Sequence, residues 1–326
     1  MVGRRDRIWI YLDTLDGRPT NTMTRPARLS LAPLETLFQT ERDTALPLPP
    51  ELARLYGCLR MPMPRSDPHV FSNFVTTLDG VVSLNVKGHA SGADISGFNA
   101  QDRMVMGLLR AIADVVVIGS GTLRADRRHV WTAEAIFPEL AREYLQLRQA
   151  LGKSAAPLNV IVSGSGEIDL RIPVFLSGKV PALIVTTAAG AKRLRNQRVP
   201  DTVEIRAIHR SASAIPASAI LDEVCRTHGK LILVEGGPRL LADFYAQHLV
   251  DEQFLTLAPQ IAGRTAGGRR LSLIMGKTFA PAHPLWGTLI DARRGSSHLF
   301  LRYSFLSSAG ASLSGRGRIT RSRAIG

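Results

Sequence analysis

The sequence lacks the features on which membrane-spanning, disulfide-stabilised and zinc-binding proteins depend. No uninterrupted apolar run approaches the ~20 residues needed to cross a bilayer. Near the N-terminus only Ile8–Leu12 is continuously apolar, which is too short for a secretory signal. The two cysteines among 326 residues, Cys58 and Cys225, are far apart and belong to no CxxC or paired-histidine spacing. We therefore expect a cytoplasmic protein with neither disulfide bonds nor a bound metal.

Lysine is also scarce, since it contributes six of the 41 basic residues. The net charge is +14, and residues 1–28 and 307–326 together carry +7 of it. No basic run is interleaved with aromatic residues, as it is on surfaces that bind single-stranded nucleic acids. The charge distribution therefore argues against nucleic acid as a partner, and it favours solvated basic ends beside a site for an anionic cofactor.

Composition divides the chain into three parts. Residues 1–66 are rich in Pro, Thr and Arg, and we expect an N-terminal extension that wraps the main domain, with short helices near Pro33–Gln39 and Pro50–Tyr56. Residues 67–306 alternate between strand and helix patterns, which is typical of an α/β domain. Residues 307–326 consist mainly of Ser, Gly and Arg, and this composition predicts a disordered basic tail.

Hydrophobic periodicity predicts the elements of the α/β part. Strands are expected at residues 70–78, 115–118, 158–163, 182–187, 203–207, 231–234, 252–257 and 297–305. Helices are expected at residues 99–111 (with Asn99 as the N-cap), 134–151, 191–195 and 216–228. The glycine-bearing stretches 88–97 and 259–284 are predicted to be loops. Because no helix pattern lies between the last two strands, at least one of them should run antiparallel.

The stretch Leu231–Tyr245, LILVEGGPRLLADFY, predicts a strand, a tight turn and a helix. Pro238 suits the first helical position, where a missing N–H costs nothing. Gly236 and Gly237 allow the backbone to approach a ligand at the positive end of that helix, where an anion such as a pyrophosphate is favoured. The alternative is a tight strand-to-helix turn with a surface carboxylate at Glu235.

Two more glycine turns are predicted at strand ends, at residues 119–122 and 164–166. Three such turns favour a nucleotide cofactor, because open α/β sheets bind ligands at the carboxyl ends of their strands. The first of the two begins like a GxGxxG fingerprint, but Arg124 occupies the third glycine position and no helix pattern follows promptly. The sequence therefore contains neither a full dinucleotide fingerprint nor a P-loop.

Several titratable residues adjoin these turns. The candidate acids at strand ends or glycine turns are Asp79, Asp94, Asp126 and Glu235. Taken singly, each is also typical of a turn or a helix cap. Arg110 lies near the end of a predicted helix, where it can contact a ligand or pair with the helix C-terminus. His89 and His129 fall in polar loops, and we expect both to be solvated.

Four motifs occur in a specific order and spacing. They are Thr77–Gly80; Leu108–Ala111 followed by Ala113–Val115; Gly119–Asp126, with the sequence GSGTLRAD; and Leu233–Pro238 followed by Val250–Glu252. With these motifs, residues 73–305 resemble the C-terminal reductase domain of the bifunctional riboflavin-biosynthesis deaminase/reductase. The H-x-E and P-C-x-x-C zinc motifs of the fused deaminase do not occur in the sequence.

The resemblance implies a dihydrofolate-reductase-like fold, which is a three-layer αβα arrangement with a mostly parallel sheet and an antiparallel C-terminal strand. It also implies an NADPH-dependent reductase, usually a homodimer, that reduces the ribosyl side chain of a phosphorylated aminopyrimidine to a ribityl chain. The hydride would pass from the nicotinamide to C1 of the sugar in its ring-opened imine form. The protein would align the two carbons and supply a proton.

Matching positions in the family suggest roles for residues of this chain. The implied cofactor-binding residues are Val75, Gly119, Gly121, Thr122, Asp126, Ser163, Gly236, Gly237, Pro238, Arg239 and Leu240. The implied substrate-binding residues are Asn73, Ser91, Arg110 and Glu235. Glu235 and Asp79 are the implied catalytic residues. By the same analogy, the turn at Gly236 and Gly237 and the helix that follows it hold the diphosphate of the cofactor.

The chain departs from the family pattern at two places. Asn73 stands where many members have a lysine, which removes a point charge suited to a phosphate or a developing anion. Where many members continue Asp-Asp-Pro, this chain has Asp126, Arg127 and Arg128. Two alternatives therefore stay open. One is a diverged reductase of another heterocycle, such as a dihydropterin; the other is a non-enzymatic nucleotide- or nucleic-acid-binding protein, which the charge of +14 motivates.

Overall fold

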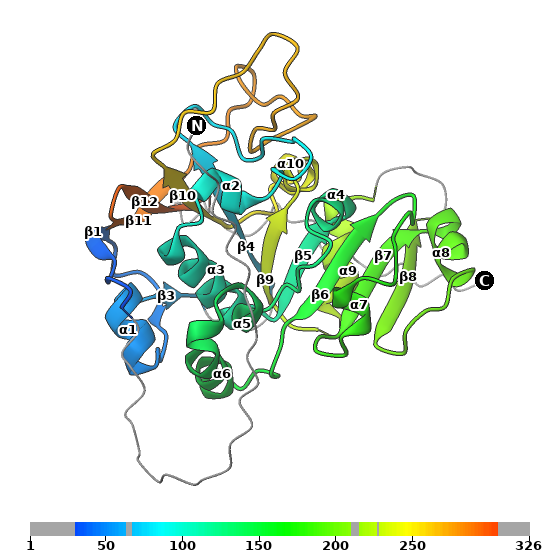
Figure 1. Cartoon of the computed structure of the whole chain (residues 1–326), viewed down its shortest axis with the longest axis horizontal. Coiled ribbons are helices and arrows are strands. Elements are labelled where there is room, and N and C mark those ends of the chain that lie inside the picture. The colour runs from blue at the N-terminus through cyan, green and yellow to red at the C-terminus, as the bar shows by residue number, and fades with distance from the viewer. Residues whose placement is uncertain (1–29, 63–66, 210–214, 227, 306–326) are drawn as a thin grey trace, which may run out of the picture. The chain divides into compact units, whose positions relative to one another are not determined.

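The computed structural model describes residues 30–62, 67–209, 215–226 and 228–305 (Figure 1). The chain from Leu31 onward belongs to one unit, so residues 31–62 of the predicted N-terminal extension lie in the same unit as the predicted reductase domain. The predicted basic tail at 307–326 lies outside the described residues. No helix in the described ranges combines the length and apolar character that a membrane span requires.

Short runs of buried Val, Ile and Leu form the parallel part of a ten-stranded sheet. Its neighbouring strands are, in order, β10 (Glu252–Ala258), β4 (His69–Thr77), β9 (Leu231–Gly236), β5 (Val115–Gly119), β6 (Leu158–Ser163), β7 (Ala182–Thr187) and β8 (Val203–His209). Each pair of neighbours in this series is parallel. Parallel strands buried on both faces read as continuous apolar runs, which is why the sequence located them well.

Three strands extend this sheet in the antiparallel sense, in the order β12 (His298–Ser304), β11 (Thr288–Gly295) and β1 (Glu35–Gln39). β12 pairs with β10, which confirms the predicted antiparallel C-terminal strand. The helix predicted at Pro33–Gln39 is wrong, because these residues form β1 against the distant β11. In addition, β2 (Thr44–Ala45) and β3 (Arg60–Met61) form a separate two-stranded sheet.

The helices are α1 (Pro50–Tyr56), α2 (Gly92–Ser96), α3 (Ala100–Ile112), α4 (Ser120–Ala125), α5 (Ala133–Ile136), α6 (Ala141–Ala150), α7 (Pro173–Leu176), α8 (Ala188–Arg195), α9 (Ala217–Cys225) and α10 (Pro238–Ala246), with a 3-10 turn at Pro138–Leu140. Asn99 caps α3 as predicted, since its side chain accepts a hydrogen bond from the Asp102 N–H. The helix predicted at 134–151 is divided at Pro138, whose ring cannot continue a helix.

Two other predictions about helices are wrong. Residues 88–97 were expected to be a loop, but they contain α2, which begins with a capping box between Ser91 and Asp94. No helix was expected directly after Gly119, but α4 starts at the next residue. Both helices are only one to two turns long, and such short elements have too little periodicity to be distinguished from a loop.

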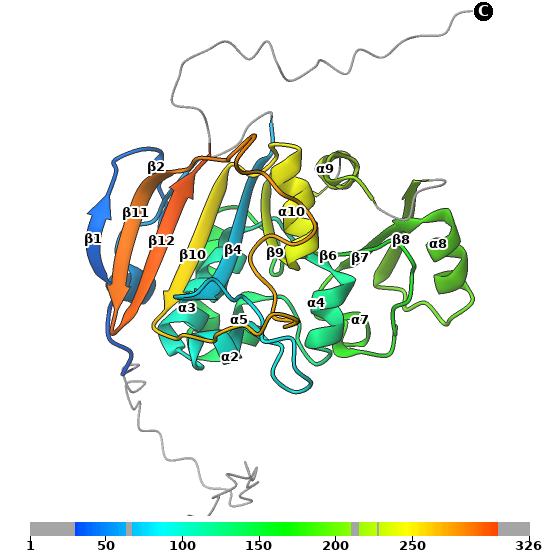
Figure 2. The same ribbon diagram turned by 90° about the horizontal axis from the view of Figure 1, so that it is seen from above.

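Helices cover both faces of the sheet (Figure 2). α9 and α10 lie on one face, where Val224 and Phe244 pack against strand residues such as Val117 and Val234. α3 and α5 lie on the other face (Figure 2). Burial of each such side chain contributes roughly 1.5–3 kcal/mol. The arrangement confirms the predicted αβα layering, and it brings the carboxyl ends of β4, β5 and β9 to one edge beside α3.

Arg293 on β11 fastens the segment from β1 to β3 to the sheet. Its guanidinium holds both oxygens of Asp291 at 2.9 Å and donates to Thr36 Oγ1 at 2.9 Å. It also donates to the carbonyl oxygens of Tyr56 and Cys58 and stacks over the Tyr56 ring, 4.2 Å from its centroid. The side chain of Arg293 is almost completely buried. One charged group therefore connects β1, α1 and the chain that follows α1.

Replacing Arg293 with Ala should destabilise the fold strongly, because the buried Asp291 carboxylate would lose its cation. The free energy of unfolding should fall by about 3–5 kcal/mol, the range for removal of one partner of a buried ion pair. Arg294→Ala, which removes an exposed pair with Glu35, should change it by less than ~1 kcal/mol. Urea unfolding of both variants measures the difference, and equal losses would contradict the anchoring role of Arg293.

Candidate active site

A cleft of about 940 Å³ opens at the carboxyl ends of β4, β5 and β9. α3, α4 and the start of α10 bound it, together with residues 82–93 and with Leu271 and Met275 of the long loop between β10 and β11. That loop is held over the cleft by hydrogen bonds from the Leu271 N–H to the Ser83 carbonyl and from the Met275 N–H to the Pro238 carbonyl. Helices, the segment 82–93 and this loop therefore border the edge of the sheet at which a ligand is predicted.

A buried ion pair lies at the centre of the cleft wall. Arg110 of α3 donates from Nε to both carboxylate oxygens of Glu235 at 3.0 Å, and from Nη2 to Oε2 at 2.7 Å. The two side chains are 2% and 5% exposed. Nη1 of Arg110 donates to the Thr132 carbonyl at 3.2 Å. Arg110 thus pairs with Glu235 rather than with the C-terminus of its own helix, and both side chains are fixed where the cleft begins.

His129 extends this network toward the glycine turn after β5. Its Nε2 lies 2.7 Å from Arg110 Nη1. A guanidinium can only donate, so Nε2 accepts and the ring proton of neutral His129 is on Nδ1, 3.9 Å from Asp126 Oδ2. Burial, followed by the charge of Arg110, lowers the pKa of His129 to about 3. The expectation of a solvated histidine is wrong, because only 15% of this side chain is exposed.

The turn between β9 and α10 leaves a helix N-terminus open to the cleft. Gly236 has φ +130°, a conformation that residues with a Cβ rarely adopt. Pro238 occupies the first turn of α10, and no side chain of the described residues caps it. Gly119 of the neighbouring turn lies so close that a Cβ there would be 3.4 Å from the Gly237 nitrogen. The two glycine turns are therefore adjacent, and the uncapped N–H groups can bind an anion.

The third predicted glycine turn, at residues 164–166, is closed by α8. Thr186 and Thr187 donate to the carbonyl oxygens of Ser163 and Gly164 at 2.6 and 2.8 Å. Ser163 Oγ accepts from the Gly166 N–H at 3.2 Å. A Cβ on Gly166 would lie 2.4 Å from a backbone oxygen of α8. These glycines allow backbone segments to pack closely, and Ser163 does not line the cleft.

Asp79 holds the long loop rather than the cleft wall. Its carboxylate accepts hydrogen bonds from Thr77 Oγ1 at 2.5 Å and from the N–H groups of Ala262 and Gly263 at 3.0 and 2.7 Å. The hydrogen bond from Thr77, supported by those from the loop, lowers the pKa of Asp79 to about 2. Asp79 does not line the cleft, so its position differs from that of a residue in contact with a substrate there.

Most of the residues singled out from the sequence meet in this one cleft. Those that line it are Asn73, Val75, Ser91, Arg110, Gly119, Gly121, Thr122, Asp126, Glu235, Gly237, Pro238, Arg239 and Leu240. Asp79, Ser163 and Gly236 do not line it. Lining residues that the sequence did not indicate include Lys87, Asp102, Met106, His129 and Trp131. The sequence could have indicated Asp102 as a lining residue, because it precedes Arg110 by eight residues and therefore lies on the same face of the helix.

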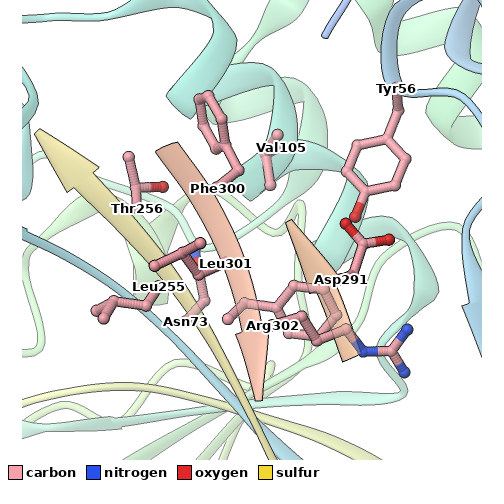
Figure 3. A pocket seen from close by; sticks show the side chains of 10 residues that line it. Tyr56, Asn73, Val105, Leu255, Thr256, Asp291, Phe300, Leu301 and Arg302 are labelled. Atoms are coloured by element: carbon pink, nitrogen blue, oxygen red, sulfur yellow. The ribbon is translucent and has the colours of Figure 1, made fainter. Parts of the chain in front are cut away.

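A second, much smaller cavity of about 10 Å³ lies between β10, β12 and α3 (Figure 3). Tyr56, Asn73 and Asp291 are among its lining residues. In Figure 3 the Tyr56 hydroxyl is directed toward the Asp291 carboxylate. Burial, with the nearby charge of Asp291, raises the pKa of Tyr56 to about 12. The space holds about one water molecule, which is too small for a substrate.

Sequence comparisons find one matching family and related reductases. A family model described as the RibD C-terminal domain matches residues 68–275. A 2,5-diamino-6-ribosylamino-4(3H)-pyrimidinone 5′-phosphate reductase of Archaeoglobus fulgidus is 26% identical over 196 residues, which cover 60% of this chain and 82% of that protein. A protein of the same description from Aquifex aeolicus is 25% identical over 198 residues, covering 60% of this chain and 79% of that protein.

Two solved structures share the fold. A pyrimidine reductase-like protein of Corynebacterium diphtheriae has a TM-score of 0.58 and 22% identity, over 73% of this chain and 91% of that chain. A diaminohydroxyphosphoribosylaminopyrimidine deaminase/5-amino-6-(5-phosphoribosylamino)uracil reductase of Thermotoga maritima has a TM-score of 0.52 and 19% identity, over 73% of this chain and 56% of that chain.

The depressed pKa of His129 predicts a specific loss of stability in acid. Unfolded His129 titrates near pH 6.5, whereas folded His129 titrates near pH 3. Between these two pH values the unfolded chain binds a proton at His129 and the folded protein does not. Over this range the residue should cost up to about 1.4 kcal/mol of unfolding free energy for each unit that the pH falls. His129→Gln, whose amide oxygen can accept from Arg110, should lack this component.

Urea unfolding at about pH 7 and pH 5 measures it, since this interval crosses the titration of unfolded His129. The wild type should lose more stability than His129→Gln as the pH falls. His89→Gln is the matched control, because His89 is 66% exposed and pairs at the surface with Asp94. Identical pH slopes for the wild type and His129→Gln would contradict the neutral, buried histidine.

Proposed function

Because the chain belongs to the RibD C-terminal domain family, we propose that it is an NADPH-dependent reductase that converts the ribosyl side chain of a phosphorylated aminopyrimidine to a ribityl chain. Family membership confirms the resemblance predicted from the sequence, and with the reductase relatives it confirms the prediction of an oxidoreductase. The observation that carries the proposal is that most of the residues implied for the cofactor, and all of those implied for the substrate, line one continuous cleft.

The cofactor side of the cleft fits a dinucleotide diphosphate. The first turn of α10 presents uncapped N–H groups beside Gly237, and the adjacent turn contributes Thr122. The positive end of a helix favours an anion at this position. The volume of about 940 Å³ lies at the upper end of the range for small-molecule sites, as two adjacent ligands require. When bound, the nicotinamide would supply a hydride.

Cations lining the cleft suit the phosphate groups of both ligands. Lys87, Arg124 and Arg239 come from three different segments and all line the cleft. Arg110 is already paired with Glu235 and is not free for a phosphate. Asn73 lines the cleft at a position where many family members have lysine. Lys87 of the neighbouring loop also lines the cleft, and it is the candidate to supply the positive charge that Asn73 lacks.

The Arg110–Glu235 pair would orient the substrate. A carboxylate has about four acceptor positions, and the contacts from Arg110 leave at least one of them for a substrate hydroxyl. Because the pair is buried and held at several points, the substrate hydroxyl would find the Glu235 carboxylate already in position. We therefore assign Glu235 to substrate binding at the reacting centre. As predicted from the sequence, we also expect a cytoplasmic homodimer.

Reduction of another heterocycle is the second candidate function, and Asn73 is the observation that favours it. NADPH oxidation by the full chain, with the phosphoribosylamino-pyrimidine and dihydrofolate assayed side by side, separates the two. We expect turnover with the pyrimidine and a product that has gained two hydrogens by mass spectrometry. Turnover with dihydrofolate alone would favour the second candidate. A failure to bind NADPH at near-micromolar concentration, about −8 kcal/mol, would contradict both.

Replacing Gly237 with Ala should obstruct the diphosphate without disturbing the fold. A Cβ at Gly237 would meet only Thr122 Oγ1, at 3.3 Å, and the backbone φ of −86° is allowed for any residue. We expect the Kd for NADPH to rise at least ~10-fold, or ~1.4 kcal/mol. Gly267→Ala is the matched control, because nothing lies within 4 Å of its Cβ position and it does not line the cleft. If fluorescence titration shows an unchanged affinity of Gly237→Ala for NADPH, the assignment of the diphosphate to this turn is contradicted.

A further inference from the structure

One face of α3 forms a wall of the cleft. Asp102, Met106 and Arg110 recur every four residues, and all three line the cleft. Arg110 is engaged with Glu235, and Met106 is apolar. Asp102 is therefore the ionisable group on this helix face that is available to a ligand. It is 5% exposed, although it belongs to the first turn of its helix.

Two hydroxyl side chains act on the Asp102 carboxyl group. They belong to Ser96 at the end of α2 and to Thr256 on β10, and both favour the charged form of the carboxyl group. Neither partner is a guanidinium or an ammonium group. The His298 ring, which also faces Asp102, uses both nitrogens within the protein, toward Asn99 at 3.1 Å and the Ser96 carbonyl at 3.0 Å. The carboxyl group is thus buried, and the side chains that act on it most strongly are hydroxyl groups.

Burial raises the pKa of Asp102, and the negative charge of Glu235 acts in the same direction. The hydroxyl groups of Thr256 and Ser96 and the nearby His298 oppose this shift without reversing it. Arg110, on the same helix, is neutralised by Glu235. The surroundings therefore favour the protonated carboxyl, which can donate a hydrogen bond or a proton.

Among the described residues, three carboxyl groups line the cleft, and their environments differ. Both oxygens of Glu235 accept hydrogen bonds from Arg110, so Glu235 is poorly suited to deliver a proton. Burial raises the pKa of Asp126 as well, but 46% of its side chain is exposed and it lies beside the turn assigned to the cofactor. Asp102 combines burial, a helix scaffold and a position on the substrate side of the cleft.

We propose that Asp102 is the catalytic residue that donates a proton to the ring oxygen of the substrate's ribosyl group. This inference rests on the proposed function. In the step, the bond between C1 and the ring oxygen breaks, and its electron pair goes to that oxygen, which takes the Asp102 proton. The lone pair of the exocyclic nitrogen forms a double bond to C1, giving the open-chain iminium.

A hydride from the nicotinamide class of reductant then adds to C1. The electron pair of the carbon–nitrogen double bond returns to nitrogen, which leaves the neutral ribitylamine. The substrate gains one hydride and one proton in total, and the Asp102 carboxylate regains its proton from water. The electron balance requires no other oxidant or reductant.

Asp102→Asn tests this assignment, because Asn keeps the size of the side chain but carries no acidic proton. In the full chain, kcat should fall by about 100-fold or more, the usual contribution of a general acid. The Kd for NADPH should be unchanged. For the wild type, kcat should fall as the pH rises through the raised pKa of Asp102, and this alkaline fall should disappear in Asp102→Asn. Asp102→Glu should recover part of the loss.

A measurement without ligands complements the kinetics. A raised pKa in the folded state makes the wild type less stable than the Asn variant as the pH rises above about 4, where the aspartate of the unfolded chain titrates. As the pH rises, the urea midpoint of Asp102→Asn should therefore increase relative to the urea midpoint of the wild type. Asp222→Asn, at an exposed position of α9, is the control and should keep both wild-type profiles.

The outcomes separate this inference from the proposed function. If the wild type fails to reduce the pyrimidine, the proposed function is overturned and the role of Asp102 with it. If the wild type is active and Asp102→Asn keeps its kcat and alkaline fall, only the assignment of Asp102 is overturned. If Asp102→Asn does not fold, the dependence of kcat on pH is measured for Asp102→Glu instead. A wild-type kcat with an unchanged fall at alkaline pH would then contradict the role of Asp102 as the acid.

Discussion

The ion pair between Arg110 and Glu235 is the interaction on which the geometry of the cleft depends. It joins the end of α3 to the carboxyl end of β9, a strand that lies between β4 and β5 inside the sheet. The same guanidinium reaches His129 and the Thr132 carbonyl, so one side chain positions three segments. Removal of either partner would leave a buried charge without compensation, at about 3–5 kcal/mol. This part of the cleft wall is therefore tied directly to the sheet.

Buried arginine has the same role elsewhere, and this gives the scarcity of lysine a structural meaning. Arg148 of α6 donates to the carbonyl oxygens of Arg110, Ala111 and Ala113, and thereby caps the C-terminus of α3. Burial lowers its pKa to about 10. Arg293 connects β1, α1 and β11 through five hydrogen-bond acceptors. A planar group with five donors can satisfy several carbonyl groups at once, which an ammonium group on a flexible stem does less well. Part of the arginine excess thus belongs to the interior and not to a surface for nucleic acid.

The sequence predicted what depends on neighbouring residues. Leu231–Tyr245 forms the expected strand, glycine turn and helix, because buried apolar runs, Gly236 and Pro238 act locally. Features that depend on distant partners were missed. Residues 35–39 form a strand only because β11, more than 250 residues later, pairs with them. His129 is buried by Arg110 and Trp131, and no local pattern indicates that contact. The glycines at 164–166 were interpreted as a ligand turn, but they serve close packing against α8.

The position of α3 explains how two groups with different charges can act on one ligand. Asp102 and Arg110 are eight residues apart, which is about 12 Å along a helix axis. Helical side chains point back toward the N-terminus of their helix, which brings the Arg110 guanidinium nearer to the Asp102 end of α3. Glu235 is close enough to help raise the pKa of Asp102 while Arg110 keeps Glu235 itself paired. The two carboxyl groups thus differ in their partners, because a guanidinium holds that of Glu235 and none among the described residues contacts that of Asp102. A ligand that lies along α3 would meet an acceptor at one end of its cleft-lining face and a proton donor at the other, and the glycine turns of β5 and β9 bound the same cleft.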